Sequence, residues 1–530
     1  MACIFGLGAC QGEPGALPPL PPRQTEARAP AGPERPVRRL ILAYVGEVRG
    51  ELDVCGCPTQ PVGGFERRAG LLGELQAEGP AVFQLDAGNL LVEGFSTGGR
   101  GDVPERARLM LDLSADVGLD AFCPGPADLA AMDVVTLAHE LEARGLAAVS
   151  ATWLDPEGRP LLPPAAVLQR DGVRVGVVGL SAAPRGDAIV SRDPVEAARE
   201  ALAALPDDLD LVVALSNLSD DDALRVAREV AGFAALLSVR NSAYAEPSAV
   251  GHTLLAKVPG RGRYVGVLRV RTSSTPGMPL DLVIAEDLRL STFDRLSARA
   301  FGLERRGSLV PDEERRSLDQ LQASLEKEGV GRNLAWYTAV PLGDRYAGDT
   351  GIHARVESFK QENLREAGER LAAQEAGPGG PRRYVSSTRC VGCHTAQTAR
   401  WSLTRHPQAW EALISRGSDQ DPECVTCHAT GFAMPGGWAE LSPQNTLRFK
   451  AVQCEACHGP LEGHPQDPAS RPVLPDRDTC TGCHDDANSP DFDYASYLPR
   501  ATCSVRASER APVSTGSGAN APAGVQEVSP

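Results

Sequence analysis

Between residues 37 and 273, short apolar runs alternate with segments in which apolar residues recur every three to four positions. Short apolar runs are typical of buried strands, and the longer recurrence is typical of helices with one buried face. We expect strands at residues 40–45, 81–85, 173–180, 211–215 and 254–258, and helices at residues 66–77, 104–117, 129–144, 194–205 and 221–230. Strands that alternate with helices at this spacing predict an α/β or layered sandwich domain.

From about residue 274 to residue 383 the chain becomes charged, and its apolar positions follow a helical period. One expected helix starts at Pro311, and a second follows after residue 350. The first stripe contains Leu318, Leu321 and Leu325, and the second contains Ile352, Val356, Phe359, Ala367 and Leu371. We expect a helical connector whose amphipathic helices pack on each other or bridge two flanking domains.

The two ends of the chain have compositions that cannot bury a core. Residues 12–36 are rich in Pro, Ala, Gly and Arg and predict a tether, so residues 1–36 form no domain. Residues 499–530 predict a disordered tail. Residues 7–10 are similar to a lipoprotein box, with Cys10 as the residue that would carry the lipid, although a start chosen inside a longer signal is a second interpretation. Both interpretations imply export.

Four copies of the pattern Cys-x-x-Cys-His occur in the last quarter of the chain. Two residues between the cysteines place both sulfurs on one face of a helical turn, where they can form thioethers with the vinyl groups of one haem. The following histidine then presents its imidazole to the iron. We therefore expect four covalently bound haem c groups, attached at Cys390 and Cys393, Cys424 and Cys427, Cys454 and Cys457, and Cys480 and Cys483, with His394, His428, His458 and His484 as proximal ligands. Two zinc sites built from paired knuckles are the alternative, but they do not require a histidine after every second cysteine.

The expected haem domain covers residues 384–498, too few to build a conventional core around four haems. The porphyrins must then supply much of the apolar packing, with Trp401, Trp410, Phe432, Trp438 and Phe449 as candidates to fill between them. Beyond the motifs this domain contains His406 and His464 as candidate distal ligands, and Met434 is a candidate for a third iron. Four irons would therefore leave at least one without a protein ligand on its distal side. We expect His353, on the connector, to be a surface or interface residue.

The charge balance restricts the partners of the chain. Its formal net charge is −16 over 530 residues, which argues against nucleic acid and against an anionic membrane surface. No stretch is long and apolar enough to span a membrane, so we expect membrane contact only through a lipid on Cys10. A soluble partner would offer a basic or neutral face.

Short motifs in the first half follow one another in a fixed order: Gly63-Gly64-Phe65, Leu85-Asp86-Ala87-Gly88-Asn89, Gly118-Leu119-Asp120-Ala121 and residues 172–180. In this order they resemble the N-terminal domain of bacterial 5′-nucleotidases. The resemblance implies the calcineurin-like metallophosphoesterase fold, with two β-sheets sandwiched between helices. We therefore expect residues 37–273 to form a four-layer α/β sandwich.

The residues that this resemblance would assign to the phosphatase metals are replaced. The opening Asp-x-His-Gly reads Glu47-Val48-Arg49-Gly50, and the aspartate that ends Asp-Ala-Gly-Asp is Asn89. The remaining histidine motifs read Pro126-Ala127, Asn217 and Ser238-Val239-Arg240-Asn241-Ser242. A two-metal phosphoesterase needs carboxylates and imidazoles to hold its ions about 3.5–4 Å apart. We expect a retained fold without phosphatase chemistry.

Cys55-Gly56-Cys57 lies just after the first strand, where the active-site loop of that family would be. The pair is compatible with a strained disulfide, a soft-metal half-site, a redox relay or two packed thiols. Cys123 is a candidate third member, since it should lie at the same edge of the fold.

Three segments of the last quarter carry a second resemblance: Trp401-Ser402-Leu403-Thr404-Arg405-His406, residues 424–432 and residues 452–460. They resemble the tetrahaem cytochrome c of the hydroxylamine pathway of nitrifiers, a family that carries electrons and keeps one iron with an open face. We therefore expect an exported electron carrier, periplasmic or at the cell surface. Its redox partners would be other cytochromes or a membrane system that oxidises quinol. The alternatives are an enzyme that acts on a small nitrogen compound at an open iron and a metal-dependent phosphoesterase.

Overall fold

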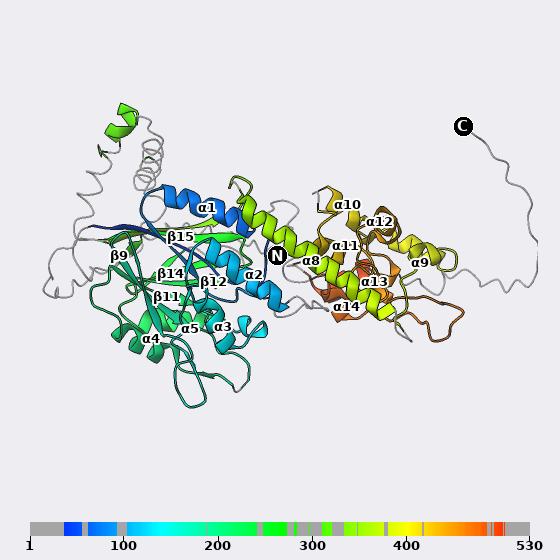
Figure 1. Ribbon diagram of the computed structural model, residues 1–530, viewed down its shortest axis with the longest axis horizontal. Helices are drawn as coiled ribbons and strands as arrows, with labels where there is room; N and C mark the ends of the chain where they lie inside the picture. Colours follow the sequence, from blue (N-terminus) through cyan, green and yellow to red (C-terminus); the bar gives the residue numbers. More distant parts are fainter. Residues whose placement is uncertain are drawn as a thin grey trace, which may run out of the picture.

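The computed structural model places an α/β sandwich beside a smaller helical part, and one long helix runs along both (Figure 1). It describes residues 37–55, 62–92, 103–186, 188–240, 247–272, 280–282, 296, 310–317, 319–320, 333–346, 348–375, 380–415, 418–484, 489, 492–501 and 503. The lipobox with Cys10, Cys57, the stripe of Leu318, Leu321 and Leu325, and the tail from residue 504 lie outside the described residues.

The first sheet has seven strands in the order β16-β17-β15-β1-β4-β5-β6. Its parallel half is built by β1, β4, β5 and β6, and β15 joins β1 on the other side as an antiparallel neighbour. The strands are β1 (Arg39–Val45), β4 (Ala81–Asp86), β5 (Leu119–Phe122), β6 (Ala147–Ala148), β15 (Tyr264–Arg271), β16 (Leu280–Leu282) and β17 (Asn333–Pro341).

The second sheet has six strands in the order β13-β14-β12-β11-β9-β8. They are β8 (Ala165–Arg170), β9 (Val173–Leu180), β11 (Leu211–Ser216), β12 (Ala235–Arg240), β13 (Ser248–Val250) and β14 (Thr253–Pro259). Two small pairs, β2 (Val54–Cys55) with β3 (Val62–Gly63) and β7 (Trp153–Leu154) with β10 (Val190–Ser191), lie outside the two sheets.

The two sheets pack face to face through buried side chains such as Leu42 and Phe83 of the first and Val177 and Leu215 of the second. The outer face of the first sheet is covered by α1 (Phe65–Ala77), α2 (Val103–Asp116) and α3 (Val134–Glu142), with the 3-10 turn Asp128–Ala130 before α3. The outer face of the second sheet is covered by α4 (Pro194–Ala203) and α5 (Asp220–Glu229). These layers confirm the expected α/β sandwich. All five expected strands and all five expected helices are present, the third of them shortened to residues 134–142.

The expectation of a purely helical connector is wrong for residues 333–341. This segment forms β17, which pairs antiparallel with β15 along its whole length, and Ala335 and Tyr337 join the core between the sheets. Leu334 and Trp336 alternate with them on the opposite face, which is the strand period inside a charged region. The sandwich therefore extends beyond residue 273, because a late strand completes its first sheet.

The expected second helix of the connector is α8 (Thr350–Glu375), which bridges the two parts of the molecule (Figure 1). Ile352 and Val356 belong to the core of the sandwich, and Leu364 packs against the apolar cluster of the helical part. At 26 residues the helix is about 39 Å long, enough to reach from one part to the other.

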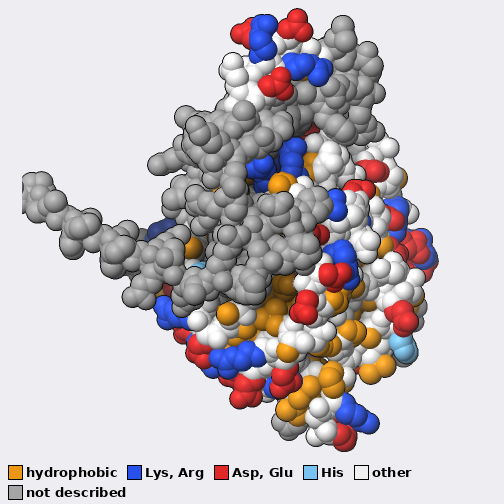
Figure 2. Space-filling view, turned by 90° about the vertical axis from the view of Figure 1, so that its left-hand side faces the viewer, with side chains coloured by type: hydrophobic (Ala, Val, Ile, Leu, Met, Phe, Trp, Pro, Cys, Tyr) orange, Lys and Arg blue, Asp and Glu red, His pale blue; other side chains and the backbone are white. Residues whose placement is uncertain are grey.

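The helical part consists of short helices around one apolar cluster. They are η2 (Ser387–Arg389), α9 (Thr395–Trp401), η3 (His406–Gln408), α10 (Ala409–Ile414), α11 (Pro422–His428), α12 (Pro443–Phe449), α13 (Cys454–His458), α14 (Arg477–Thr481) and α15 (Tyr494–Ala501). Among the described residues, no helix combines the length and apolar character needed to cross a membrane. Acidic and basic side chains are interspersed over the described surface at the sandwich end of the molecule (Figure 2), so the acidic excess is not gathered there.

Candidate functional site

Three of the four motif histidines form a hydrogen bond through Nδ1 of the ring. Nδ1 of His428 donates to the carbonyl oxygen of Ala409 at 2.6 Å, and Nδ1 of His458 donates to that of Val473 at 2.8 Å. Nδ1 of His484 lies 2.8 Å from the hydroxyl of Ser489. A neutral imidazole that donates through Nδ1 keeps the lone pair of Nε2, which is the form that binds a metal.

Two pairs of imidazole rings lie at equal centroid separations. The centroids of His394 and His464 are 6.3 Å apart with the planes 25° from parallel, and those of His406 and His484 are 6.3 Å apart at 53°. Imidazole nitrogens bind a metal at about 2.0–2.1 Å, so a separation of 6.3 Å between ring centroids leaves room for one ion between two imidazole nitrogens. Each pair contains one histidine predicted as a proximal ligand, His394 or His484, and one predicted as a candidate distal ligand, His464 or His406.

The distal candidates are themselves oriented. Nδ1 of His464 donates to the carbonyl oxygen of Ser470 at 2.9 Å, which leaves Nε2 available. Burial, and then the neighbouring His484, lowers the pKa of His406, which favours its neutral ring. His484, the partner of His406, has aromatic contacts of its own. Phe492 stacks on its ring with centroids 4.9 Å apart, and Tyr497 meets the same ring edge-on.

The eight motif cysteines form no disulfide bond with one another, and they lie near the surface of the helical part. The thiols of Cys390 and Cys454 hydrogen bond to each other, so the first and third motifs adjoin. Within the described residues, which include all eight, no group of three or more His, Cys, Asp or Glu side chains could hold a metal ion. Paired zinc knuckles would bring four sulfurs together, and this arrangement does not.

The surroundings of the motifs suit an apolar prosthetic group. Val391 lies inside the first motif and is 45 % exposed, and Val473 and Leu474 beside His458 are 61 % and 85 % exposed. Exposed apolar side chains next to each other are costly unless something covers them. The cysteine spacing, the Nδ1 hydrogen bonds that orient the imidazoles and these apolar neighbours together fit covalently attached haem.

The aromatic residues differ in part from expectation. Trp410, Phe432, Trp438 and Phe449 pack in one cluster with Tyr384 and Val425. Phe432 meets Trp438 edge-on at 4.9 Å, and Trp438 stacks on Phe449 at 5.9 Å. They therefore form a small protein core, because their rings find partners in one another.

Two further candidates lie away from the paired rings. Met434 follows the positive-φ residue Ala433 in a turn, and its side chain is 43 % exposed. His353 on α8 is exposed, and its Nδ1 lies 3.1 Å from a carboxylate oxygen of Glu66 in α1. The expectation of an interface residue at His353 is confirmed.

In the sandwich, the positions where the nucleotidase motifs would place metal ligands contact one another. The guanidinium of Arg49 donates from Nε to the Glu47 carboxylate at 2.6 Å, and the amide of Asn89 donates to the same carboxylate. Glu47, Arg49 and Asn89 all have left-handed φ angles, of 51°, 55° and 54°. Such strained angles persist only where the surrounding structure imposes them.

Two buried carboxyl groups lie beneath this cluster. Asp128 accepts hydrogen bonds from the backbone N–H groups of Asn89, Leu91 and Gly125, although burial still raises its pKa to about 6. Burial raises the pKa of Asp86 to about 8, against the opposing effect of Arg68. The Asn217 amide donates to the carbonyl oxygens of Ala87, Cys123 and Pro124. The Asp128 carboxylate and the Asn217 amide therefore form hydrogen bonds with backbone groups of the protein itself.

Cys123 is a buried free thiol whose Sγ lies 3.5 Å from the hydroxyl of Ser181. Burial raises its pKa to about 12, so the thiol stays protonated and unreactive. Cys57 lies outside the described residues, and the grouping of Cys123 with Cys55 and Cys57 stays a prediction.

Sequence analysis missed Lys360 of α8, which is buried between the two parts of the molecule. A signal was available, because Ile352, Val356, Lys360 and Leu364 recur every four residues and so share one side of the helix. A lysine in an otherwise apolar stripe indicates a buried partner.

The motifs, the oriented imidazoles and the two ring pairs are features that c-type cytochromes share, and we call this helical part the cytochrome part. Residues 389–459, which contain the first three motifs, match the family described as cytochrome c554 and c-prime. Cytochrome c-554 of Nitrosomonas europaea is 36 % identical over 92 residues, which cover 14 % of this chain and 38 % of that protein. The resemblance expected for this part is confirmed, and the chain spans less than half the length of the relative it matches.

Solved structures similar to part of the chain include phosphoesterases. The 5′-nucleotidase precursor of Thermus thermophilus has a TM-score of 0.43 at 17 % identity, covering 72 % of this chain and 68 % of that one. The calcineurin-like phosphoesterase YfkN of Bacillus subtilis has a TM-score of 0.44 at 13 % identity, covering 62 % and 99 %. The NAD nucleotidase of Haemophilus influenzae has a TM-score of 0.43 at 14 % identity, covering 69 % of each.

Proposed function

We propose that this chain carries electrons on four covalently bound haem c groups, and that its sandwich is a scaffold or docking surface without phosphatase chemistry. The observation that carries the proposal is that two pairs of imidazole rings have centroids 6.3 Å apart, and that each pair contains one motif histidine. A haem bound there supplies an iron that alternates between ferric and ferrous states.

The residues that would hold the haems follow from the motifs and the ring pairs. The eight motif cysteines would form the thioethers, and His394, His428, His458 and His484 would be the proximal ligands. His464 would be the distal ligand opposite His394, and His406 the one opposite His484. Met434 remains a candidate for one of the other two irons.

The proposal for the sandwich rests on its charge pattern. Glu47 is held by Arg49 and Asn89, so a cation there would have to displace a guanidinium at 2.6 Å. Asn217 points its amide at backbone carbonyls, where an imidazole would be needed to bind a metal. We infer a fold that serves as a support for the cytochrome.

Attachment of haem to cysteine pairs also favours export, with the chain in the periplasm or at the cell surface and Cys10 as the candidate lipid anchor. Its partners would be redox proteins, other cytochromes or a quinol-oxidising membrane system, with a basic or neutral docking face that complements the net charge of −16.

The first test counts haems. The mass of the denatured protein, matured with an intact haem-attachment system, should include four haems, and the variant with Cys454→Ala and Cys457→Ala should include three. Fewer than four in the parent chain would overturn the proposal.

The second test examines the distal ligands. His464→Ala and His406→Ala should each convert one low-spin iron to high-spin, seen as a partial shift of the Soret band on adding carbon monoxide to reduced protein. The matched control is His353→Ala, since that ring binds Glu66 and should leave the spectrum unchanged. An unchanged spectrum in both distal variants would contradict the assignment.

A second function is favoured by one observation. Among the described residues, no other histidine ring faces His428 or His458 across a comparable gap. An iron with one free side could bind and convert a small nitrogen compound. Binding of nitric oxide to the unmodified reduced protein would support this function, and a spectrum unaffected by either gas would exclude it.

A further inference from the structure

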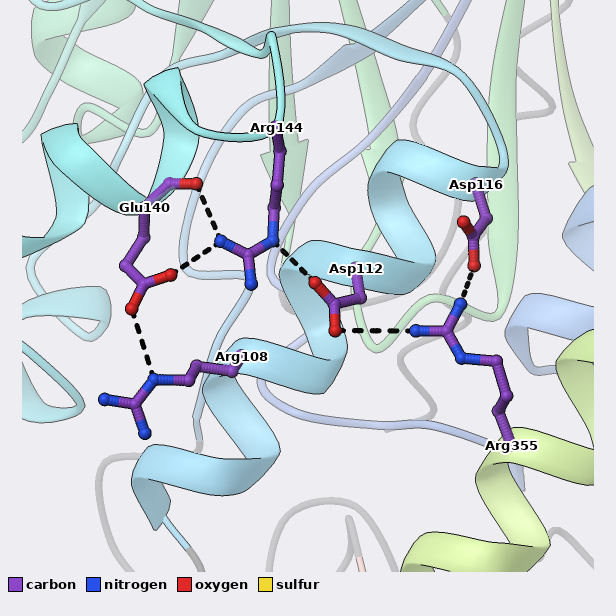
Figure 3. A network of polar contacts seen from close by, with 6 residues as sticks. All are labelled: Arg108, Asp112, Asp116, Glu140, Arg144 and Arg355. Atoms are coloured by element: carbon purple, nitrogen blue, oxygen red, sulfur yellow. Dashed lines mark hydrogen bonds and ion pairs between the residues drawn. The ribbon is translucent and has the colours of Figure 1, made fainter.

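Helix α8 is fastened to the sandwich by a network of charges. Arg355 forms ion pairs with Asp112, at 3.4 Å, and with Asp116 of α2. Arg144 joins Asp112 to Glu140 of α3, so α2, α3 and α8 are linked through one chain of contacts (Figure 3). Together with the burial of Ile352 and Val356, this network holds the first half of α8 rigidly on the sandwich.

The second half of the same helix reaches the cytochrome part. Leu364 packs against the cluster that contains Trp410 and Val425, and α8 contacts α11, the helix of the second haem motif. A displacement of α8 would therefore change its packing against α11.

Lys360 lies where the two halves of α8 meet, and its side chain is 2 % exposed. Its Nζ is 3.0 Å from a carboxylate oxygen of Asp53 in the sandwich and 2.7 Å from one of Asp421 in the cytochrome part. Glu357, one turn earlier on α8, is 3.4 Å away. Burial alone would lower the pKa of Lys360, but the carboxylates of Asp53 and Asp421 outweigh it and raise the pKa, so the amine stays charged.

Asp421 is the residue immediately before α11, and its carbonyl oxygen accepts the N–H of Val425 in the first turn. The rest of this helix includes Cys424, Cys427 and His428, the second motif. Lys360 is therefore paired with the residue that immediately precedes the helix of the second haem motif.

We propose that Lys360 is a positioning residue that joins the sandwich to the second haem motif and keeps the reduction potential of that haem high. The inference rests on the proposed function, since it requires a haem at Cys424 and Cys427. Ferric haem carries one more positive charge than ferrous haem, so a nearby cation favours the ferrous state. A buried charge is screened less by salt than an exposed one, so its influence survives at physiological ionic strength.

The test is a spectroscopic redox titration of the haem-loaded full chain. Lys360→Met should lower the potential of one haem by a shift equivalent to about a threefold or larger change in its reduction equilibrium constant, where tenfold is about 59 mV for one electron. The other three potentials should stay in place. Lys360→Arg keeps the charge, so the potential of the same haem in this variant should stay close to that of the parent chain.

Asp421→Asn gives the sign test. Removing a negative charge from the same pair should raise the potential of the same haem, opposite to Lys360→Met. Loosened packing alone would move the potential in the same direction in both variants. If Lys360→Met does not fold, Asp421→Asn alone decides, and a potential that is unchanged or lower in that variant overturns the inference.

The matched control is Arg365→Gln, which removes a positive charge on the same helix from a side chain that is 53 % exposed. It should shift no potential measurably. Four unaltered potentials in Lys360→Met, or an equal shift in Arg365→Gln, would overturn the inference while leaving the proposed function intact. A parent chain without four haems would instead defeat the proposed function.

Discussion

The sandwich and the cytochrome part reach stability by different routes. The sandwich buries both faces of its two sheets, with Leu85, Val177 and Leu215 fully enclosed. The cytochrome part has one small cluster, and its Leu403 and Leu474 are 87 % and 85 % exposed. A domain that covers its own apolar surface needs no cofactor to fold, whereas short helices with exposed leucines require something that covers them.

The polar groups of the two parts differ in the same way. In the sandwich the side chains of Glu47, Asn89 and Asn217 are bound to one another or to backbone, whereas in the cytochrome part His428, His458 and His464 use one ring nitrogen and leave the other for a ligand. The polar side chains of the sandwich form hydrogen bonds within the protein, whereas these histidines keep one ring nitrogen for a ligand.

Removal of all haem should have the largest effect and should separate the two parts. In a variant with all eight motif cysteines changed to Ser, we expect residues 384–484 to lose hydrogen-exchange protection while β1, β4, β9 and β11 keep it. The reason is that the cytochrome cluster alone buries too little apolar surface. Protection that persists in α9 to α14 would show that the helical part folds without haem.

A core truncation tests the opposite side of the comparison. Leu85→Ala should lower the free energy of unfolding of the sandwich by about 2–5 kcal/mol, because it leaves a cavity between the sheets. Val167→Ala, at a side chain that is 38 % exposed on β8, is the control and should cost well under half as much. Chemical denaturation followed by tryptophan fluorescence would measure both, with the Soret band expected to stay unchanged in native protein.

A smaller effect concerns pH. The pKa of Asp86 is raised by burial from 3.8 to about 8, so the folded state binds a proton that the unfolded state releases. The resulting stabilisation is complete below about pH 4 and is lost as the pH rises towards 8. Asp86→Asn should remove this dependence, flattening the stability curve by up to about 1.4 kcal/mol per pH unit.

The control for this measurement is Asp155→Asn. The backbone N–H of Arg159 lowers the pKa of Asp155, so this carboxyl stays ionised in both states between pH 5 and 8. Denaturation midpoints across that range should keep the parent slope in Asp155→Asn. An equal flattening in both variants would contradict the assignment to Asp86.

The smallest expected effect is none at all. Purified protein supplied with manganese or zinc should not hydrolyse nucleotides, because Arg49 occupies the carboxylate of Glu47 and repels cations. Turnover that survives purification and disappears on Glu47→Gln with Asp86→Asn would show that the sandwich is an enzyme.

Much of the local structure could be predicted from the sequence. Apolar periodicity located β1, β4, β9, β11, β14 and α8, and bridging of the two domains was one of two expectations for α8. The strand β17 was missed because its alternating residues are few and lie within a charged region. The four motifs identified the cysteines and histidines proposed to hold haem without any structure, because this chemistry depends on residues only three or four positions apart.

The sequence by itself determined which side chains are proposed to hold haem and which residues stand where the nucleotidase motifs would place metal ligands. Tertiary structure alone decided that the ring of His464 lies near that of His394, that the ring of His406 lies near that of His484, and that Lys360 joins carboxylates 307 and 61 residues away. Short-range patterns reflect backbone geometry, which repeats along the chain. Contacts between distant residues depend on how the helices pack, and the order of residues along the chain does not carry that information in any local period.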